Sequence, residues 1–250
     1  MDPALFEQEY RIHYYEIDYN KKVLITSLMN YLDDIAIGQS EQLGVGVDYL
    51  KQRNVAWVLY KWDIKIHKYP VYGESVKVRT APHSFNKFYA YRWFEILSPK
   101  GERLVSANSI WLFIKTDKKR PIKITEDMYK AYGVESTEPL EIEDIRQLST
   151  IDTEKEFHVR YSDIDTNRHV NNVKYAAWAI ETIPLNIVID YTLFNLKVTY
   201  KKETTYGKTI KALTQVLYYG DNITCLHNIV DEDDKELCLL ESKWAKNTID

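Results

Sequence analysis

Apolar side chains recur near a 3.6-residue spacing in two segments of the chain, and this spacing predicts two helices. The first helix is expected over about residues 25–43 and the second over about residues 172–182. Asn171 or Asn172 can cap the second helix, and Pro184 closes it. This second helix is apolar around much of its girth, so other structure is expected to wrap around it. The apolar positions that define the two patterns are Leu28, Leu32, Ile35, Ala36, Val173, Ala176, Ala177 and Ile180.

Long segments after the first helix are alternating or rich in aromatic residues, which predicts strands. A turn that contains Pro99 and Gly101 separates the last two of them. An acidic stretch at residues 135–144 has no apolar period and is interpreted as a linker. The strands of the first half are expected over about residues 56–68, 75–83, 89–97 and 103–115.

The two halves of the chain carry similar short segments in the same order, which indicates an internal duplication. An Ile-Asp-x-Asn-x-x-Val pattern occurs at residues 17–23 and again at residues 164–170, each time directly before a predicted helix. The other similar segments are Tyr72–Lys77 with Tyr206–Lys211, and Ser109–Trp111 with Ser242–Trp244.

A helix followed by antiparallel strands, repeated twice, predicts an α+β fold of two hotdog units in tandem. Each unit would be a long helix wrapped by an antiparallel sheet. The expected domains are residues 1–134 and 155–250, joined by a linker over residues 135–154. Tyrosine is abundant, with 20 residues, and glycine is scarce, with 8, which also favours extensive β structure.

The composition is that of an ordinary globular protein with a slight acidic excess. A net charge of −4 and a pI near 5.9 give no support to nucleic-acid binding or to attraction by an anionic membrane. The two cysteines, Cys225 and Cys238, have no metal-ligand spacing and form no disulfide framework, which suits a reducing compartment. The first residues lack a targeting pattern, and no stretch approaches ~18 apolar residues. We therefore expect a cytoplasmic protein that does not insert into a membrane.

The segment from Arg160 to Pro184 carries the most specific motif of the chain, RYSDIDTNRHVNNVKYAAWAIETIP. It resembles the plant and bacterial acyl-acyl carrier protein thioesterases, whose pattern is close to W-S-D-L-D-x-N-x-H-V-N-N-V-K-Y-x-x-W. The matching positions are Asp163, Asp165, Asn167, His169, Val170, Asn171, Asn172, Val173, Lys174, Tyr175 and Trp178. The resemblance extends over nearly the whole chain, through Tyr69–Gly73, Ser109–Trp111, Lys118–Arg120 and Tyr200–Gly207.

The resemblance implies hydrolysis of the thioester of a fatty acyl-acyl carrier protein, which releases a free fatty acid and ends chain elongation. It implies a catalytic second domain, a first domain that holds the acyl chain, and acyl carrier protein as the partner. No cofactor and no metal are implied. It also brings a carboxylate, Glu203, into the site of the motif. Candidate walls of the acyl pocket, for which a plain core role is an equal alternative, are Met29, Leu32, Ile35 and Trp57.

Three polar residues of the motif suit this chemistry. Asp165, Asn167 and His169 are spaced by two, so an extended backbone would project all three from one face. They precede a predicted helix N-terminus, where backbone N–H groups favour developing negative charge. Thioester hydrolysis needs a base that activates water and donors that hold the oxyanion. We expect Glu203 to activate the water, with Asp165 and His169 orienting it and Asn167 donating to the carbonyl. His169 remains an alternative base.

One position departs from the family pattern. Plant members often have a cysteine directly after the glutamate, and this chain has Thr204 there. A cysteinyl intermediate from that position is excluded, which favours direct attack by water. A threonine nucleophile is an alternative that would need strong activation of its hydroxyl.

The first repeat lacks the groups that could act as a base. Lys22 stands opposite His169, and Tyr69 stands opposite Glu203. We therefore expect the first half to be non-catalytic.

Simpler interpretations of the same residues stay open. The Asp-x-Asn-x-His run could be a polar turn that caps a helix, and alternation along residues 194–200 would make Glu203 an exposed strand carboxylate unless a bulge or strand end re-aims it. A metal site is a further alternative. Its ligands would be Asp163, Asp165, His169 and Glu203.

Two other functions also stay open: a hotdog thioesterase for acyl-coenzyme A, and a non-catalytic acyl-binding protein. Basic clusters at residues 118–123 or 197–202 could meet an acidic carrier protein, although such clusters are more often solvated faces. The sequence leaves the acyl-chain length and the oligomeric state open, a homodimer included.

Overall fold

The computed structural model of the protein describes residues 5–247. These residues divide into two compact units, each with a main helix and antiparallel strands. The first unit comprises the chain up to Trp62 together with His67–Ile142. The second comprises Asp63–Ile66 together with the chain from Glu143 onward.

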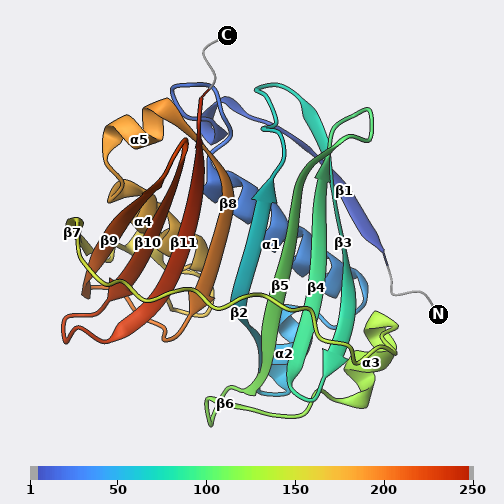
Figure 1. Ribbon diagram of the computed structural model, residues 1–250. Coiled ribbons are helices and arrows are strands. Elements are labelled where there is room, and N and C mark those ends of the chain that lie inside the picture. The colour runs from blue at the N-terminus through green and yellow to red at the C-terminus, as the bar shows by residue number, and fades with distance from the viewer. Residues whose placement is uncertain (1–4, 248–250) are drawn as a thin grey trace. The chain divides into compact units, whose positions relative to one another are not determined.

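The strands of the first unit are β1 (Phe6–Arg11), β2 (Val55–Ile66), β3 (Ser75–Asn86), β4 (Tyr89–Leu97), β5 (Arg103–Lys115) and β6 (Arg120–Pro121). Their order in the sheet is β1-β3-β4-β5-β2, and β6 pairs with β5. The ladders from β1 through β3 and β4 to β5 are antiparallel (Figure 1).

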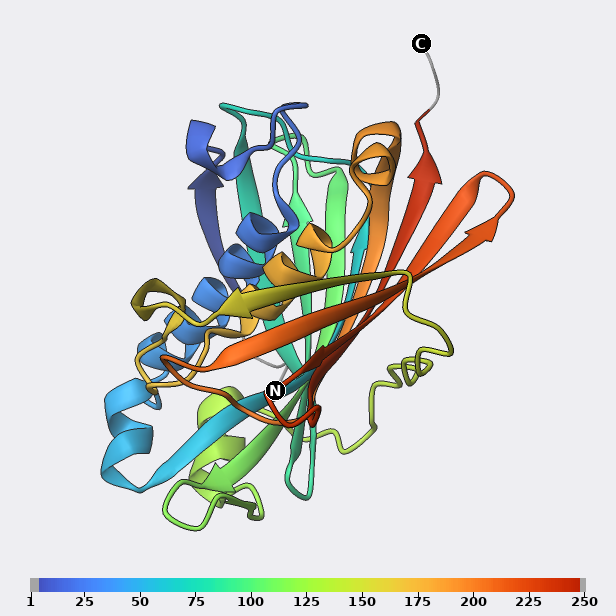
Figure 2. The same cartoon turned by 90° about the vertical axis from the view of Figure 1, so that its left-hand side faces the viewer.

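Helix α1 (Ile25–Gln42) crosses one face of these strands and contacts β1 and β3 (Figures 1 and 2). Leu28, Met29, Leu32 and Ile35 form the stripe that it turns inward, and all four are fully buried. Burial of an aliphatic side chain of this size stabilises a fold by about 1.5–3 kcal/mol. The helix has no side-chain cap at its N-terminus. Packing of the apolar stripe therefore accounts for most of its stability.

Two short helices of the first unit were not expected from the sequence. They are α2 (Val47–Gln52) and α3 (Glu126–Tyr132), the second of which ends at Gly133 with a φ of 63°. Helix α3 buries Met128 and Tyr132 in an apolar cluster that also contains Phe85 and Phe113. Neither helix is long enough to show a clear 3.6-residue period, so tertiary packing fixes them.

The strands of the second unit are β7 (Thr153–His158), β8 (Tyr191–Tyr200), β9 (Thr209–Tyr219), β10 (Asn222–Val230) and β11 (Glu236–Lys246). Their order is β8-β11-β10-β9-β7, and all the ladders along it are antiparallel. Strand for strand, this order repeats that of the first unit. The second unit is therefore a copy of the first in topology.

Helix α4 (Asn172–Glu181) packs against β9, β10 and β11 of the second unit (Figure 1). The side chain of Asn171 caps it by accepting a hydrogen bond of 2.9 Å from the backbone N–H of Val173. A further short helix, α5 (Leu185–Asp190), follows Pro184 and was not predicted. Both units thus have the α+β arrangement expected from the sequence, a main helix against an antiparallel sheet.

The predicted element boundaries agree with the structure closely in the first unit. Strands β4 and β5 span the residues expected, and α1 ends one residue earlier than predicted. Strand β3 continues three residues past its predicted end, beyond Pro82. The pairing of β3 with β4 shifts register between Pro82 and Ser84, and this irregularity accommodates a residue that cannot donate to the ladder.

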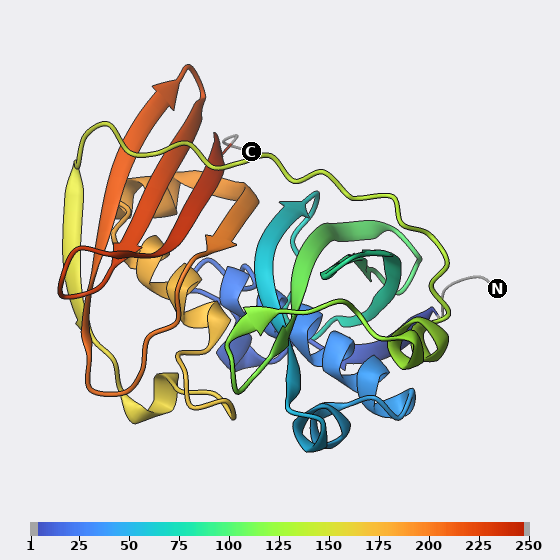
Figure 3. The same cartoon turned by 90° about the horizontal axis from the view of Figure 1, so that it is seen from below.

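Residues 134–152 contain no helix or strand, and Figure 3 shows them as the long yellow-green coil that precedes β7. Within residues 5–247, no helix is both long and apolar enough to span a membrane.

Candidate active site

The motif residues lie in a tight loop that enters helix α4. The backbone N–H of Asp165 donates to the carbonyl of His169 at 2.9 Å, and that of Arg168 donates to the carbonyl of Asp165 at 3.1 Å. Ile164 and Val170 close the loop as an isolated β-bridge. The expectation of an extended segment with three side chains on one face is therefore wrong.

The side chain of Asp165 explains why this segment turns. Its Oδ1 accepts hydrogen bonds from the backbone N–H of Asn167 at 2.8 Å and of His169 at 3.3 Å. Aspartate favours turns through such bonds to the backbone that follows it. Arg168 takes up a left-handed φ of 66° within the loop. The turn brings Asp165, Asn167 and His169 together, although by a different geometry from the one predicted.

Asn167 has a second contact with the same carboxylate. Its Nδ2 lies 3.5 Å from Oδ2 of Asp165, at the outer limit for a hydrogen bond. This weak contact orients the amide without committing its donors. The amide of Asn167 can therefore donate to a ligand oxygen.

Asp163 anchors the start of the loop. Its carboxylate is fully buried and accepts hydrogen bonds from Arg160, with Nε at 3.2 Å and Nη2 at 3.1 Å, while Nζ of Lys174 lies 3.5 Å away. Burial opposes the negative charge, but the hydrogen bonds from Arg160 outweigh it and hold the pKa of Asp163 below its usual range. The carbonyl of Asp163 also accepts from the N–H of Asn171, the residue that caps α4. Asp163 thus ties the loop to the helix, a role not recognised in the sequence.

Glu203 lies in the loop between β8 and β9, three residues after β8 ends. Because the strand has ended, the alternation along β8 does not determine where Glu203 points. Its Oε1 lies 3.2 Å from Nε2 of His169, and the two side chains are 45% and 34% exposed respectively. Both groups are therefore accessible to water and close enough to share a proton.

Two further hydrogen bonds join the loop of Glu203 to the loop of His169. The backbone N–H of Val170 donates to the carbonyl of Thr204 at 3.0 Å, and Oγ1 of Thr205 donates to the carbonyl of Arg168 at 3.2 Å. The residues on both sides of His169 are consequently tied to the loop of Glu203.

Tyr175 is a neighbour of the site to which sequence reasoning gave no role. It lies in the first turn of α4, is buried, and packs edge-on against Tyr200 with ring centroids 5.8 Å apart. Burial raises the pKa of Tyr175 above its ordinary value, and the negative charges of Glu203 and Asp165 act in the same direction. The hydroxyl therefore stays protonated near both carboxylates. Its place in the matched motif was the signal that could have identified it.

The cysteines are unsuited to nucleophilic attack. Cys225 and Cys238 are buried in β10 and β11. Burial raises the pKa of the Cys225 thiol to about 12, and that of Cys238 also lies well above its ordinary value. A buried thiol without a thiolate fraction is inert. Thr204, which replaces the cysteine of the plant pattern, is buried as well.

The first unit repeats the loop without its reactive groups. The N–H of Asp18 donates to the carbonyl of Lys22 at 2.8 Å, and Lys21 has a φ of 63°, matching Asp165 and Arg168 of the second unit. Nζ of Lys22 lies 5.9 Å from the centre of the Tyr69 ring. The duplication thus preserves the backbone of the loop but places a lysine against a tyrosine where the second unit has His169 against Glu203.

The candidate pocket residues occupy two places in the first unit. Met29, Leu32 and Ile35 lie on the buried face of α1. Trp57 lies on β2 and packs against Phe113, with ring centroids 4.6 Å apart, in the cluster that α3 completes. The role of these residues as pocket walls stays a prediction.

A metal site is not supported. Among residues 5–247, no group of three or more histidine, cysteine, aspartate or glutamate side chains is placed to hold a metal ion. Asp163 is instead occupied by Arg160 and Lys174. The loop instead places a histidine against a carboxylate, with the amide of Asn167 in the same loop and the N-terminus of α4 after it.

Two domain families match the chain. The acyl-ACP thioesterase N-terminal domain matches residues 3–132, and the acyl-ACP thioesterase C-terminal domain matches residues 146–246. Here ACP denotes acyl carrier protein. The two matches together cover most of the chain, and the gap between them, residues 133–145, lies between α3 and β7.

Curated relatives and solved structures agree with these matches. The chloroplastic palmitoyl-ACP thioesterase of Arabidopsis thaliana is 28% identical over 270 residues, which covers 99% of this chain and 65% of the plant protein. A chloroplastic oleoyl-ACP thioesterase of the same plant is 26% identical and covers 85% of this chain, which spans 64% of that protein. This chain is therefore shorter than these plant relatives by about a third of their length.

Among solved structures, a Lactobacillus plantarum protein proposed to be an oleoyl thioesterase superposes with a TM-score of 0.95 at 28% identity, over 99% of this chain and 98% of that one. The 12:0-ACP thioesterase of Umbellularia californica has the same fold, with a TM-score of 0.88 at 23% identity, over 97% of this chain and 94% of that one. The fold is thus the tandem hotdog expected from the sequence, and the chain belongs to the acyl-ACP thioesterase family.

Proposed function

We propose that the protein hydrolyses the thioester of a fatty acyl-ACP, releasing the free fatty acid and ending chain elongation. The observation that carries the proposal is the contact of 3.2 Å between Nε2 of His169 and Oε1 of Glu203 in a site partly open to water. Membership of the family and the names of the plant relatives, which act on palmitoyl-ACP and oleoyl-ACP, support the same reaction.

In the proposed mechanism a water molecule attacks the thioester carbonyl while Glu203 accepts its proton. His169, whose Nε2 lies 3.2 Å from Oε1 of Glu203, orients this water and polarises it. The amide of Asn167 donates to the carbonyl oxygen as negative charge develops there, and Asp165 holds the turn that aims the amide. The tetrahedral intermediate then expels the thiol as the carbon–sulfur bond breaks, and the proton on Glu203 passes to the departing sulfur.

The first unit is proposed to hold the acyl chain. Its loop keeps the turn but not the His–Glu pair, and it offers a long apolar helix face in α1. Met29, Leu32, Ile35 and, on β2, Trp57 are the proposed wall residues. The domain division of residues 1–134 and 155–250, with a linker between them, is proposed on the same grounds. ACP is the proposed partner, a cytoplasmic location stays a prediction, and a homodimer stays open.

The test is the hydrolysis of a panel of acyl-ACP and acyl-coenzyme A thioesters, from four to eighteen carbons, by the purified protein without added cofactor. We expect turnover with a kcat/KM that strongly favours the ACP substrates. Equal or faster turnover of the coenzyme A esters would transfer the protein to the acyl-coenzyme A hydrolases. A folded protein that turns over no substrate would contradict the hydrolase and leave an acyl-binding protein.

A further inference from the structure

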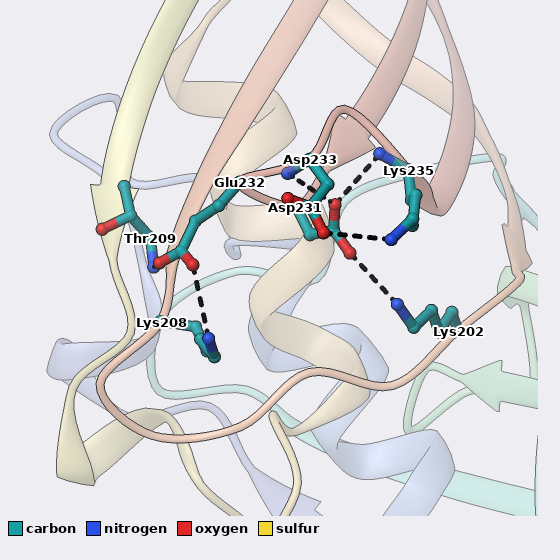
Figure 4. Close-up of polar contacts among 7 residues, drawn as sticks. All are labelled: Lys202, Lys208, Thr209, Asp231, Glu232, Asp233 and Lys235. Atoms are coloured by element: carbon teal, nitrogen blue, oxygen red, sulfur yellow. Dashed lines mark hydrogen bonds and ion pairs between the residues drawn. The ribbon is translucent and has the colours of Figure 1, made fainter.

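The turn between β10 and β11 presents four consecutive acidic residues, Asp231 to Asp234. Figure 4 shows this turn beside the connection from β8 to β9, which carries Glu203. That connection, residues 201–208, contains no helix or strand. The acidic turn is therefore in a position to determine how the loop of Glu203 is held.

Asp231 uses its two carboxylate oxygens for different purposes. Oδ1 accepts hydrogen bonds of 3.0 Å from the backbone N–H groups of Asp233 and Lys235, which shape the turn itself. Oδ2 accepts a hydrogen bond of 3.1 Å from Nζ of Lys202, the residue directly before Glu203. Hydrogen bonds from the backbone of Lys235 and from Lys202 hold the pKa of Asp231 below its usual range. The carboxylate is thus charged at neutral pH and reaches the loop.

Glu232 acts on the other end of the same loop. Its Oε2 lies 3.3 Å from Nζ of Lys208, and its Oε1 accepts a hydrogen bond of 2.9 Å from the backbone N–H of Thr209. Lys208 is the last residue of the loop and Thr209 is the first residue of β9. Neighbouring residues of one turn therefore hold the loop on both sides of Glu203 (Figure 4).

We propose that Asp231 and Glu232 are positioning residues that brace the loop so that the carboxylate of Glu203 stays at His169. This inference rests on the proposed function, in which Glu203 accepts the proton from water. The backbone of the loop is already tied to Leu237 at its start, to Val170 in its middle and to Val159 at its end. The ion pair of Asp231 adds restraint at Lys202, directly before Glu203, and the ion pair of Glu232 adds restraint at Lys208, the last residue of the loop.

The ion pairs of Asp231 with Lys202 and of Glu232 with Lys208, called the brace below, affect catalysis more than they affect the fold. Lys202 and Lys208 are more than half exposed, and an exposed ion pair contributes little to the stability of a protein. Catalysis is far more sensitive to position, since a misplacement of about 1 Å can cost ~10²-fold in rate. Loss of one ion pair should therefore leave the protein folded while it lowers the rate.

The same turn provides matched controls. Asp234 pairs with Lys211 at 3.1 Å and Asp233 pairs with Lys235 at 3.0 Å, and neither lysine belongs to the loop of Glu203. Asp234 has a φ of 59°, a conformation that asparagine tolerates. The variant Asp234→Asn therefore removes one charge from the turn without touching the brace.

The test compares Asp231→Asn with Asp234→Asn. An asparagine at position 231 keeps an acceptor for the turn but presents an NH₂ group to Lys202 in place of Oδ2. We expect kcat to fall about 3- to 10-fold in Asp231→Asn, with KM nearly unchanged, because the loop of Glu203 is loosened while the acyl site is intact. Lys202→Met should lower kcat by a similar factor, Lys202→Arg should restore it, and the double variant should be no slower than either single variant.

A second measurement does not depend on activity. Hydrogen–deuterium exchange of the amides in residues 201–208 should quicken in Asp231→Asn and match wild type in Asp234→Asn. Wild-type exchange and wild-type kcat in Asp231→Asn would overturn the brace, as would an equal loss of kcat in Asp234→Asn. Faster exchange in a protein whose wild type hydrolyses no thioester would keep the brace and contradict only the proposed function.

Discussion

Replacement of Glu203 by glutamine is expected to lower kcat for acyl-ACP hydrolysis by a factor on the order of 10²–10⁴, the usual contribution of a general base. Glutamine has nearly the shape of glutamate and can still hydrogen-bond to His169, but it cannot take up the proton of the attacking water. KM should change little, because the proposed acyl-binding unit is untouched. Steady-state release of the thiol, measured at several pH values, gives both constants.

The same experiment decides between the two candidate bases. If His169 accepts the proton instead, His169→Gln will cause the larger loss and Glu203→Gln will cost only about tenfold, as expected for a group that orients a base. Glu156→Gln is the matched control, since it makes the same chemical change at an exposed residue of β7. A kcat for Glu203→Gln of half the wild-type value or more would exclude Glu203 from the chemistry.

The sequence predicts which residues form the candidate site better than it predicts their geometry. Asp165, Asn167 and His169 follow from one continuous motif, and the structure places them in one loop. A spacing of two suggested an extended segment, but the hydrogen bonds from backbone N–H groups to Asp165 create a turn instead. Glu203 is distant from the motif in the sequence. It contacts His169 from the loop that follows the end of β8, where the side chain is no longer confined to one face of a strand. Periodicity carries no information about where a loop side chain points once the strand has ended.

The internal repeat is predicted from the sequence down to individual equivalent residues. The short similar segments of the two halves place Lys22 at the position equivalent to His169, and Tyr69 at the position equivalent to Glu203. The structure places Lys22 against Tyr69, as it places His169 against Glu203. Helices α2, α3 and α5 were missed because each has only six or seven residues. Such short helices depend on packing partners that are distant in the sequence.

His227 has a specific place among the buried polar groups of the second unit. It lies on β10, is almost completely buried, and joins two hydroxyls: its Nδ1 lies 2.7 Å from Oγ1 of Thr214 and its Nε2 lies 3.0 Å from Oγ of Ser242. The hydroxyl of Thr214 also hydrogen-bonds to the hydroxyl of Thr182, at the end of α4. On the other side of the imidazole, Nε1 of Trp244 donates to Oγ of Ser242 at 2.9 Å. The hydroxyl partners are neutral, so none of them compensates a positive charge on the imidazole.

Acid is therefore expected to destabilise the second unit through this one side chain. Burial lowers the pKa of His227 to about 3 in the folded protein, against about 6.5 in an unfolded chain. Between these values the unfolded state binds a proton that the folded state does not, so the free energy of unfolding falls as the pH falls from about 6.5 towards 3. By pH 5 the contribution of His227 to this loss should be roughly 2 kcal/mol relative to pH 8, while Asp33 of the first unit, whose pKa burial raises to about 7, acts in the opposite direction. Urea denaturation of wild type and of a variant without the imidazole at pH 8, 6.5 and 5 isolates it.

The decisive variant is His227→Gln, which can both donate and accept but does not titrate. It should be less stable than wild type at pH 8 by about 1–3 kcal/mol, because one amide cannot reproduce both ring hydrogen bonds. Its further loss between pH 8 and pH 5 should nevertheless be smaller than that of wild type by roughly 2 kcal/mol. His158→Gln, at an exposed histidine of β7, should keep the wild-type slope. Equal slopes for wild type and His227→Gln would mean that the buried imidazole is not what makes the protein sensitive to acid, and that its charged form is accommodated in the folded state.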